Sequence, residues 1–463
     1  MIQSIINSYP DLQKRIDRFW EVSAAKIDSI EDEYDYSKGS PVFTWDGKYT
    51  TRGWTEWTEG FVYGSAILQF DATGAARYLR IGRERTTSCM AKHVTHTGVH
   101  DHGFNNVSTY GNLLRLSAEG RIDASDWERE YYRMALKCSG AVQASRWSSV
   151  EDGGYIYSFN GPHSLFADTI RSLRSLAIAH LLDHELLGEH DEAYSLLERL
   201  LIHAETTARY IVYHGEGRDA YDISGRTVHE AIFNLNDGKF RCPSTQQGYS
   251  PFSTWTRGLA WIVTGFTEEL EYIDVLDETG ANAQTFERFG GKQSVIERFL
   301  SVARMCADFY LANSCIDGIP YWDTGAPGLA NLGDWRSRPS DPFNEYEPID
   351  SSAAAIAAQG LLRLGEYLSS HGDAESGAVY TTAGVRIVDA LMAEPYISLG
   401  DTHQGLLLHS VYHRPNGWDR VPAGRSVPSG ESCMWGDYHI REAVLLLDRL
   451  VNRKTYYAFW RIT

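Results

Sequence analysis

Hydrophobic residues recur at intervals of three and four along most of the chain, which is the spacing of one buried face of an α-helix. A clear case is the segment 193–204, with apolar positions Ala193, Leu196, Leu197, Leu200, Leu201 and Ala204. Similar patterns predict helices near 12–32, 60–80, 104–118, 127–142, 163–184, 254–273, 292–313, 350–370, 374–393 and 437–452. The sequence therefore predicts an all-α protein of roughly eleven or twelve helices.

The segments between the expected helices are rich in Gly and in aromatic side chains, as at 45–57, 155–163, 219–253 and 320–348. Trp and Tyr rings stack on the apolar faces of sugars and offer polar edges. Helix pairs joined by such loops predict a ring of α-hairpins with a cleft on one side. No Ser/Pro/Gly-rich boundary and no repeat interrupts the chain, so we expect residues 1–463 to form a single domain.

Composition narrows the possible partners. The 463 residues include 43 Lys plus Arg against 61 Asp plus Glu, a formal net charge of -18. Without a basic run, a nucleic-acid surface is not expected. No segment approaches the ~20 apolar residues of a membrane span. Charged residues interrupt positions 1–20, so no signal peptide is expected and a cytoplasmic location is predicted. The six cysteines are scattered, as reduced thiols would be.

The first candidate site is the histidine-rich stretch His100, Asp101, His102, Gly103, Phe104, preceded by His93 and His96. Such a stretch resembles a metal site, but adjacent residues of a helix point in different directions and no second ligand cluster is evident. A solvated loop with structural histidines is the other alternative. We favour Asp101 as a carboxylate of the cleft, at the start of the following helix.

The second candidate is Asp168, which precedes a helix that soon becomes apolar. Alone it would be an acidic residue favoured by the helix dipole. If Asp168 lies beside Asp101 in an aromatic cleft, the pair becomes a candidate for acid and base catalysis. Desolvation and mutual repulsion drive the pKa values of two such carboxylates apart, which can leave one of them protonated as an acid.

The third candidate is the stretch 247–261, in which Ser253 or Thr254 is expected to cap a helix carrying Trp255, Arg257 and Trp261. An Arg between two Trp residues can offer a bidentate fork to a carboxylate ligand. The alternative is that the two Trp belong to the core and Arg257 pairs with an internal Asp or Glu. His229 lies in the same long loop, before a strand-like 231–233, and could equally be structural.

Together these stretches resemble glycoside hydrolase family 88, the unsaturated glucuronyl hydrolases, from about Trp54 to Asp437. The matching segments are WTEGF at 57–61, HDHGF at 100–104, Asp168 heading its helix, QGY at 247–249, STWTRGLAW at 253–261, PYWD at 320–323, DSSAA at 350–354 and WGDY at 435–438. The resemblance implies an incomplete (α/α)6 barrel. It also implies hydration of the double bond between carbons 4 and 5 of a terminal unsaturated uronic acid left by a polysaccharide lyase.

The resemblance also implies roles for particular residues. Asp168 would be the general acid and base, and Asp101 would contact ring hydroxyls while raising the pKa of Asp168. The terminal-sugar subsite and its aromatic walls would comprise His229, Gln247, Trp255, Arg257, Trp261, Trp57 and Trp147. No metal or other cofactor is required by this chemistry.

The chain departs from the family pattern beside the expected site. An Asn or a Met-Asn pair is expected after the catalytic Asp, whereas Thr169, Ile170, Arg171 and Ser172 follow it here. The segment 147–168 is also longer than usual, and Pro251 and Phe252 replace acidic or small residues. The leaving sugar and the oligomeric state stay open.

Three alternative functions remain at this stage. A rhamnogalacturonyl hydrolase would share the Trp255, Arg257, Trp261 pattern, although the 100–104 stretch argues against it. A sugar 2-epimerase on the same type of barrel would depend on His229 rather than Asp168. A non-catalytic oligosaccharide-binding protein would keep the cleft alone.

Overall fold

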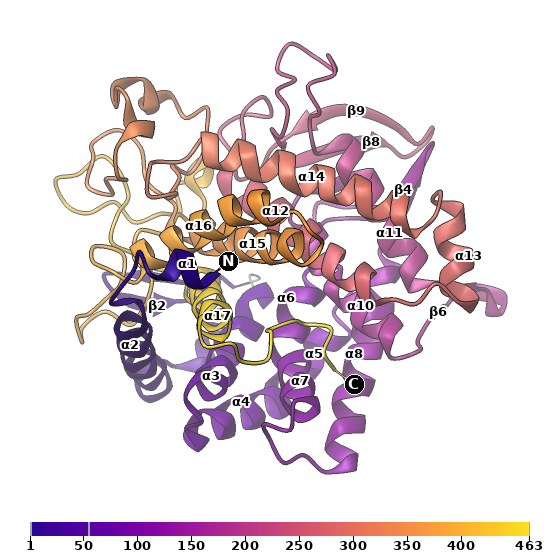
Figure 1. The fold of residues 1–463 in the computed structure, drawn as a ribbon, viewed down its shortest axis with the longest axis horizontal. Helices are drawn as coiled ribbons and strands as arrows, with labels where there is room; N and C mark the ends of the chain where they lie inside the picture. The colour runs from indigo at the N-terminus through magenta and orange to yellow at the C-terminus, as the bar shows by residue number, and fades with distance from the viewer. Residues whose placement is uncertain (1, 54–55, 463) are drawn as a thin grey trace.

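A ring of helices organises the molecule, seen in the computed structural model, which describes residues 2–53 and 56–462 (Figure 1). The inner ring has six segments, of which four are single helices and two are interrupted. The single helices are α3 (Glu59–Thr73), α12 (Thr256–Val275), α15 (Ser351–Ser370) and α17 (Met434–Val451). The interrupted segments are α6 (His102–Asn106), η3 (Val107–Gly111) and α7 (Asn112–Ala118), and α9 (Thr169–Ser172) with α10 (Arg174–Leu181).

Each inner segment packs on the next, and α17 returns to pack on α3, which closes the ring. Figure 1 shows the last helix, α17 in yellow, beside the indigo and violet helices of the first part of the chain. Inner helices are buried on nearly every side, as in α15, where Ser351 through Gly365 are all buried. A helix that is buried all round needs small and apolar residues on every face, and the AAAIAAQG run at 353–360 supplies them.

The outer helices cover the inner ring with one buried stripe each. They are α2 (Leu12–Glu33), α4 (Ala76–Cys89), α8 (Asp126–Ser145), α11 (Leu196–Tyr210), α14 (Lys292–Ala312) and α16 (Ala374–Leu391). Each packs against its inner neighbour, for example α4 on α3 and α16 on α15. Within the described residues, six inner and six outer helical segments form an (α/α)6 barrel, and the all-α prediction is confirmed.

The remaining elements are short. The helices are α1 (Ile2–Ile6), α5 (Ala91–Val94), α13 (Gly280–Arg288) and the single turns η1 (Tyr36–Lys38), η2 (Glu56–Thr58), η4 (Glu189–Asp191), η5 (Pro327–Asn331), η6 (Trp335–Ser337) and η7 (Arg414–Asn416). Antiparallel strands pair as β1 (Phe43–Trp45) with β2 (Lys48–Thr50), β3 (Trp147–Val150) with β4 (Gly153–Ile156), and β6 (Leu186–Leu187) with β7 (Ala193–Tyr194). A three-stranded sheet orders β5 (Ser164–Phe166), β8 (Glu230–Asn234) and β9 (Lys239–Ser244).

Several predicted boundaries were wrong. The helix expected at 60–80 ends at Gly74, whose φ of 74° favours glycine, and α4 starts anew at Ala76. The helix expected at 163–184 begins only after strand β5 and Asp168. Trp255, rather than Ser253 or Thr254, holds the N-cap position of α12. These errors share a cause, because apolar periodicity does not distinguish a buried strand or turn from the first turn of a helix.

Residues near the start of the chain tie the last inner helix into place. Thr44 N–H donates to the carbonyl of Ser432 at 2.9 Å, and the Tyr49 hydroxyl donates to Asp437 Oδ2 at 2.8 Å. The same carboxylate accepts the N–H groups of Leu406 and Leu407. Asp437 therefore joins three segments, and Cys433 holds the N-cap position of α17.

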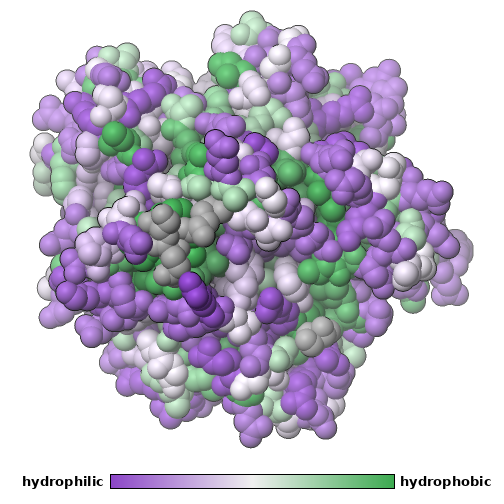
Figure 2. Space-filling view, in the orientation of Figure 1, coloured by the Kyte–Doolittle hydropathy of each residue, from purple (hydrophilic) through white to green (hydrophobic). Residues whose placement is uncertain are grey.

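Hydrophilic residues cover most of the face in Figure 2, with small separate hydrophobic patches between them. None of the described helices is both long enough and apolar enough to cross a bilayer. All six cysteines are free thiols.

Candidate active site

A cavity opens at the end of the ring where three inner segments begin. The starts of α6, α9 and α12 contribute to it, together with η2 and the segment 412–418. Its lining residues are Trp57, His100, Asp101, Phe104, Phe159, Asp168, Gln246, Gln247, Trp255, Arg257, Trp261, Tyr412, His413, Asn416 and Trp418. Seven of the nine residues predicted for the site therefore line one cavity.

Asp101 and Asp168 occupy equivalent places, each at the N-cap position of an inner helix. Neither side chain accepts a hydrogen bond from the helix that it precedes, which leaves both carboxylates to the cavity. The two helix starts touch at Gly103, whose N–H donates to Ser172 Oγ at 3.0 Å. A Cβ on Gly103 would lie 2.2 Å from the carbonyl oxygen of Ser172, so the close approach of the two aspartates requires glycine here.

His100 lies between the two aspartates. Its Nε2 is 3.8 Å from Asp101 Oδ1 and 3.7 Å from Asp168 Oδ2, and its side chain is 1% exposed. One side-chain nitrogen or oxygen from each of the three residues lies within 4.8 Å of the other two. His102 instead points away, with its ring nitrogens on Ser139 Oγ and the carbonyl of His96. The joint His100 and His102 metal site weighed from the sequence is therefore not formed.

Burial and neighbouring charge set unequal protonation states in this trio. Burial raises the pKa of Asp101 to about 6, and the charge of Asp168 adds to this effect. Burial also raises the pKa of Asp168, but His100 and His229 lower it by more, so it lies below its usual value. Burial lowers the pKa of His100, yet the two aspartates outweigh it and raise the pKa overall. The resemblance implied that Asp101 raises the pKa of Asp168, but that pKa lies below its usual value because His100 and His229 outweigh burial.

Arg257 is held by the protein on several sides. Its Nη1 donates to Asp350 Oδ2 at 2.9 Å, and its Nη2 donates to Gln247 Oε1 at 2.9 Å and the Tyr412 carbonyl at 2.8 Å. The internal acid pair considered as an alternative is thus present. Arg257 lines the cavity while it fixes Gln247 and the 411–412 backbone, so its guanidinium is already neutralised.

His229 lies behind Trp255, with ring centroids 4.7 Å apart, and is not part of the cavity lining. Its Nδ1 accepts the backbone N–H of Gln246 at 2.9 Å, so in the neutral ring the proton is on Nε2. That Nε2 is buried without a hydrogen-bond partner among the described residues. Burial lowers the pKa of His229 to about 4, which makes it a neutral donor at neutral pH.

Three tryptophans shape the cavity. Trp57 stacks on Trp435 at 5.0 Å, Trp261 packs on Phe104 at 4.9 Å, and Trp255 lies beside Arg257. Trp147 does not line the cavity. It lies on β3 against Gly154 and under the guanidinium of Arg199, 5.0 Å from the ring centre.

Several lining residues were not predicted. Phe159 lies within the aromatic loop 155–163 that was expected to border the cleft, but it was not singled out, and the segment with Tyr412, His413, Asn416 and Trp418 was not assigned to the site. Asp419 holds this wall by accepting the N–H groups of Tyr412 and His413. Since 412–418 lie more than 150 residues beyond Arg257, periodicity could not place them at the site.

Known proteins share both the sequence pattern and this fold. No family model matches the chain. The chain is 27% identical over 440 residues to an unsaturated glucuronyl hydrolase of Bacillus sp. (strain GL1), which covers 93% of this chain and 95% of that protein. It is 26% identical over 428 residues to an unsaturated chondroitin disaccharide hydrolase of Streptococcus pneumoniae, covering 90% and 89%.

Solved structures agree. The unsaturated glucuronyl hydrolase from Bacillus sp. GL1 superimposes with a TM-score of 0.69 at 23% identity, over 95% of this chain and 97% of that chain. A variant of the Streptococcus agalactiae enzyme complexed with dGlcA-GalNAc6S superimposes with a TM-score of 0.63 at 19% identity, over 96% and 93%. The chain is therefore similar to the unsaturated glucuronyl hydrolases in sequence and in fold.

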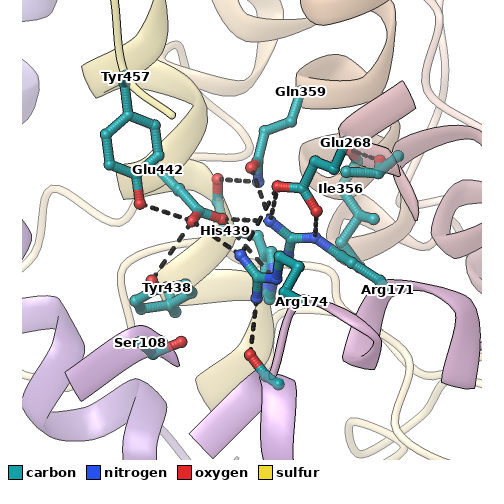
Figure 3. Close-up of polar contacts among 12 residues, drawn as sticks. Ser108, Arg171, Arg174, Glu268, Ile356, Gln359, Tyr438, His439, Glu442 and Tyr457 are labelled. Carbon is teal, nitrogen blue, oxygen red and sulfur yellow. Dashed lines mark hydrogen bonds and ion pairs between the residues drawn. The ribbon is translucent and has the colours of Figure 1, made fainter. Parts of the chain in front are cut away.

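The departure from the family pattern after Asp168 has a structural counterpart. Arg171 points into the barrel core, where Figure 3 shows it with Arg174 among acidic side chains of α12 and α17. Arg171 Nε donates to Glu268 at 3.0 Å, and its Nη2 donates to Glu442 at 2.8 Å. Arg171 lies 5.7 Å from the centre of Trp261, and Arg174 donates to the carbonyl of Gly103 at 3.0 Å. This ion network therefore lies next to Trp261 of the cavity lining and to the start of α6.

Proposed function

We propose that the protein removes a 4,5-unsaturated glucuronyl residue from the non-reducing end of lyase-generated oligosaccharides. The observation that carries the proposal is the convergence of Asp101 and Asp168 in a cavity walled by Trp57, Trp255 and Trp261. Indole faces suit the apolar side of a sugar ring, and the carboxylates suit proton transfer and hydroxyl recognition. The likeness of the chain to unsaturated glucuronyl hydrolases supports the same substrate class.

The chemistry follows from the substrate bond. The double bond between carbons 4 and 5 is a vinyl ether, so a proton added to carbon 4 leaves a cation at carbon 5 that the ring oxygen stabilises. Water adds to carbon 5, the hemiketal opens, and the leaving sugar is released. No redox group is needed.

Asp168 is the proposed acid and base. It delivers a proton to carbon 4 and then, as a carboxylate, accepts a proton from the attacking water. Because its pKa is low in the free protein, it must gain a proton when the anionic uronate binds, since a nearby negative charge raises a carboxyl pKa. Asp101 is assigned to the ring hydroxyls.

The polar groups beside the aspartates are proposed to orient the sugar. His229 offers a buried Nε2–H, and Gln247 is fixed through its Oε1 by Arg257. The occupied guanidinium of Arg257 favours a supporting role over direct binding of the uronate carboxylate. Trp147 is outside the cavity lining and has no proposed contact with the terminal sugar.

The epimerase alternative is disfavoured by the same geometry. A histidine base needs a free ring nitrogen, whereas Nδ1 of His229 accepts two backbone N–H groups, from Gln246 and Gln247. The likeness to unsaturated glucuronyl hydrolases also disfavours a rhamnogalacturonyl substrate. We further propose a cytoplasmic protein, in keeping with its free thiols, without nucleic-acid or membrane partners. Cell fractionation tests the location.

Loss of the ultraviolet absorbance of the substrate double bond tests the function. Unsaturated glucuronyl disaccharides of several linkages are incubated with the wild type, Asp168→Asn and the exposed control Asp123→Asn. We expect the wild type and the control to remove the absorbance and Asp168→Asn to be slower by about 10³-fold or more. A folded wild type that leaves every disaccharide intact would overturn the proposal. Loss of activity with a chelator would show that a metal is required.

A further inference from the structure

Asp168 needs a source for the proton that it delivers. Its pKa lies below the usual range, so the free protein holds it as a carboxylate at neutral pH. Asp101, with a pKa of about 6, is also mostly ionised above that pH. The reaction begins with donation of a proton, yet both aspartates of the site are mainly ionised at neutral pH.

His100 is the group placed to hold that proton. Its Nε2 lies 3.7 Å from Asp168 Oδ2 and 3.8 Å from Asp101 Oδ1. Neither ring nitrogen has a hydrogen-bond partner among the described residues, and one oxygen of Asp168, Oδ1, is likewise buried without one. A buried imidazole with no fixed partner and two carboxylates nearby is unusual for a structural histidine, which normally satisfies its ring nitrogens.

The backbone of His100 is fixed. Its carbonyl accepts hydrogen bonds from Ser172 Oγ at 2.6 Å and Gln143 Nε2 at 2.8 Å. Its ring packs against Phe159 and against Phe166, with centroids 6.2 and 5.6 Å apart. The ring is therefore held beside Asp168, and a shift of under 1 Å would bring Nε2 within hydrogen-bonding distance when substrate closes the site.

The other titratable groups around His100 do not compete for this role. Arg146, at the end of α8, uses its guanidinium on the carbonyls of Tyr157 and Ser158. Burial lowers the pKa of His203 on α11 to about 3 and that of His229 before β8 to about 4, so both stay neutral. Of the described groups facing His100, the two aspartates are those that attract its proton.

We propose that His100 is the proton reservoir of Asp168. As the uronate binds, the Nε2 proton of His100 passes to Asp168 Oδ2, and Asp168 passes it to carbon 4. Water then adds to carbon 5 and gives one proton to Asp168, which returns it to Nε2. One proton enters the sugar, one comes from water, and the imidazolium is restored. This inference rests on the function proposed above.

The test is the pH dependence of kcat/KM for His100→Gln, which keeps a polar side chain but cannot carry the proton. Without His100 the proton must reside on the aspartates. The alkaline limb of the pH profile, where kcat/KM falls as the pH rises, is therefore expected to move down toward about pH 6, the pKa of Asp101. Above that limb, kcat/KM falls about tenfold per pH unit. We therefore expect a loss of about tenfold or more at pH 7.5 and a much smaller one at pH 5.5.

The matched control is His102→Gln, at a buried histidine next to Asp101 whose ring nitrogens are both occupied. Its alkaline limb is expected to stay with the wild type, whatever its activity. If His100→Gln lowers kcat/KM equally at every pH and the alkaline limb does not move, His100 has only a packing role and the inference is overturned. An inactive wild type would instead refute the proposed function.

A second measurement does not depend on turnover. Imidazole ¹⁵N resonances are titrated in the wild type and in Asp168→Asn, with His100 assigned by the signal missing from His100→Gln or, if that variant does not fold, from His100→Asn. We expect the His100 imidazolium to persist above pH 6.5 and its pKa to fall in Asp168→Asn. A His100 ring that is neutral at pH 6 in the wild type would overturn the inference.

Discussion

Asp350 Oδ2 accepts a hydrogen bond from Arg257 Nη1 at 2.9 Å inside the cavity wall. The other oxygen of Asp350 accepts the Ser352 N–H at the start of α15 and, at 3.3 Å, the N–H of Val411. One ion pair thus joins α12, α15 and the segment that carries Tyr412. Its function is to hold the wall together, and the sequence alone could not separate this role from direct ligand binding.

Arg257→Lys should weaken the site without unfolding the protein. Lysine keeps the charge but cannot reach Asp350, Gln247 and the Tyr412 carbonyl together. We expect kcat/KM to fall by about 10- to 100-fold, with Gln247 and the 411–418 wall loosened. The control is Arg298→Lys, in a half-exposed ion pair with Glu205. Steady-state kinetics check both, and activity within twofold of wild type would contradict the anchoring role.

Gly103→Ala should separate the two aspartates. The added Cβ would lie 2.2 Å from the Ser172 carbonyl oxygen, so the starts of α6 and α9 must move apart. We expect a loss of about 10²-fold in kcat and destabilisation of about 1–3 kcal/mol, as in other overpacked sites. Gly400→Ala, where a Cβ meets nothing within 4 Å, is the control. Denaturant unfolding and turnover are measured on both, and equal values for the two variants would contradict the prediction.

Asp101→Asn should stabilise the protein at pH 7.5 while impairing activity. The folded-state pKa of about 6 lies above the ordinary pKa of 3.8 for an aspartate, so the carboxylate opposes folding increasingly as pH rises from about 4 to 6, and fully above 6. Two pH units correspond to roughly 3 kcal/mol at most. We expect a higher denaturation midpoint for Asp101→Asn at pH 7.5 and little difference near pH 4. A variant that is less stable than wild type at pH 7.5 would contradict the direction.

The ion network under the cavity should show strong coupling. Arg171→Met removes the nearest cation of Glu268 and Glu442 and leaves them the longer contacts with Arg174, at 3.6 and 3.7 Å. Breaking a buried pair costs about 3–5 kcal/mol, and Arg174 should offset part of that cost. Arg171→Met combined with Glu442→Gln removes one of those charges and should recover part of the loss. A double-mutant cycle by denaturant unfolding measures the coupling. Strictly additive effects would show that the network is not a unit.

The extent of sequence-based prediction follows from the range of each interaction. Helices such as α8 and α15 could be predicted from their own apolar residues, whereas the (α/α)6 barrel was implied by the resemblance to a known family. Asp101 and Asp168 could be identified as candidates, but their separation depends on the contact between Gly103 and Ser172, 69 residues apart. The partner of Arg257 lies 93 residues away, and nothing local distinguishes Asp350 from other acids.

His100 and Trp147 show that the sequence does not predict the direction of a side chain. The sequence shows that both residue types suit a sugar site, but not which way either side chain points. Trp147 turns to Arg199, outside the cavity lining, whereas His100 turns between the aspartates. A strand pair and a helix start determine those directions, and both depend on tertiary packing.

Closure of the ring by α17 has a consequence for the chain as it is made. Thr44 and Tyr49 bind Glu431, Ser432 and Asp437, nearly 390 residues later. A ribosome releases the first helices long before this seam can form, so α3 keeps an uncovered flank throughout most of synthesis. Such late, non-local closure slows folding and leaves apolar surface exposed to other nascent chains. We therefore expect the protein to depend on chaperones during expression. We also expect truncation of the C-terminus before residue 431 to impair folding.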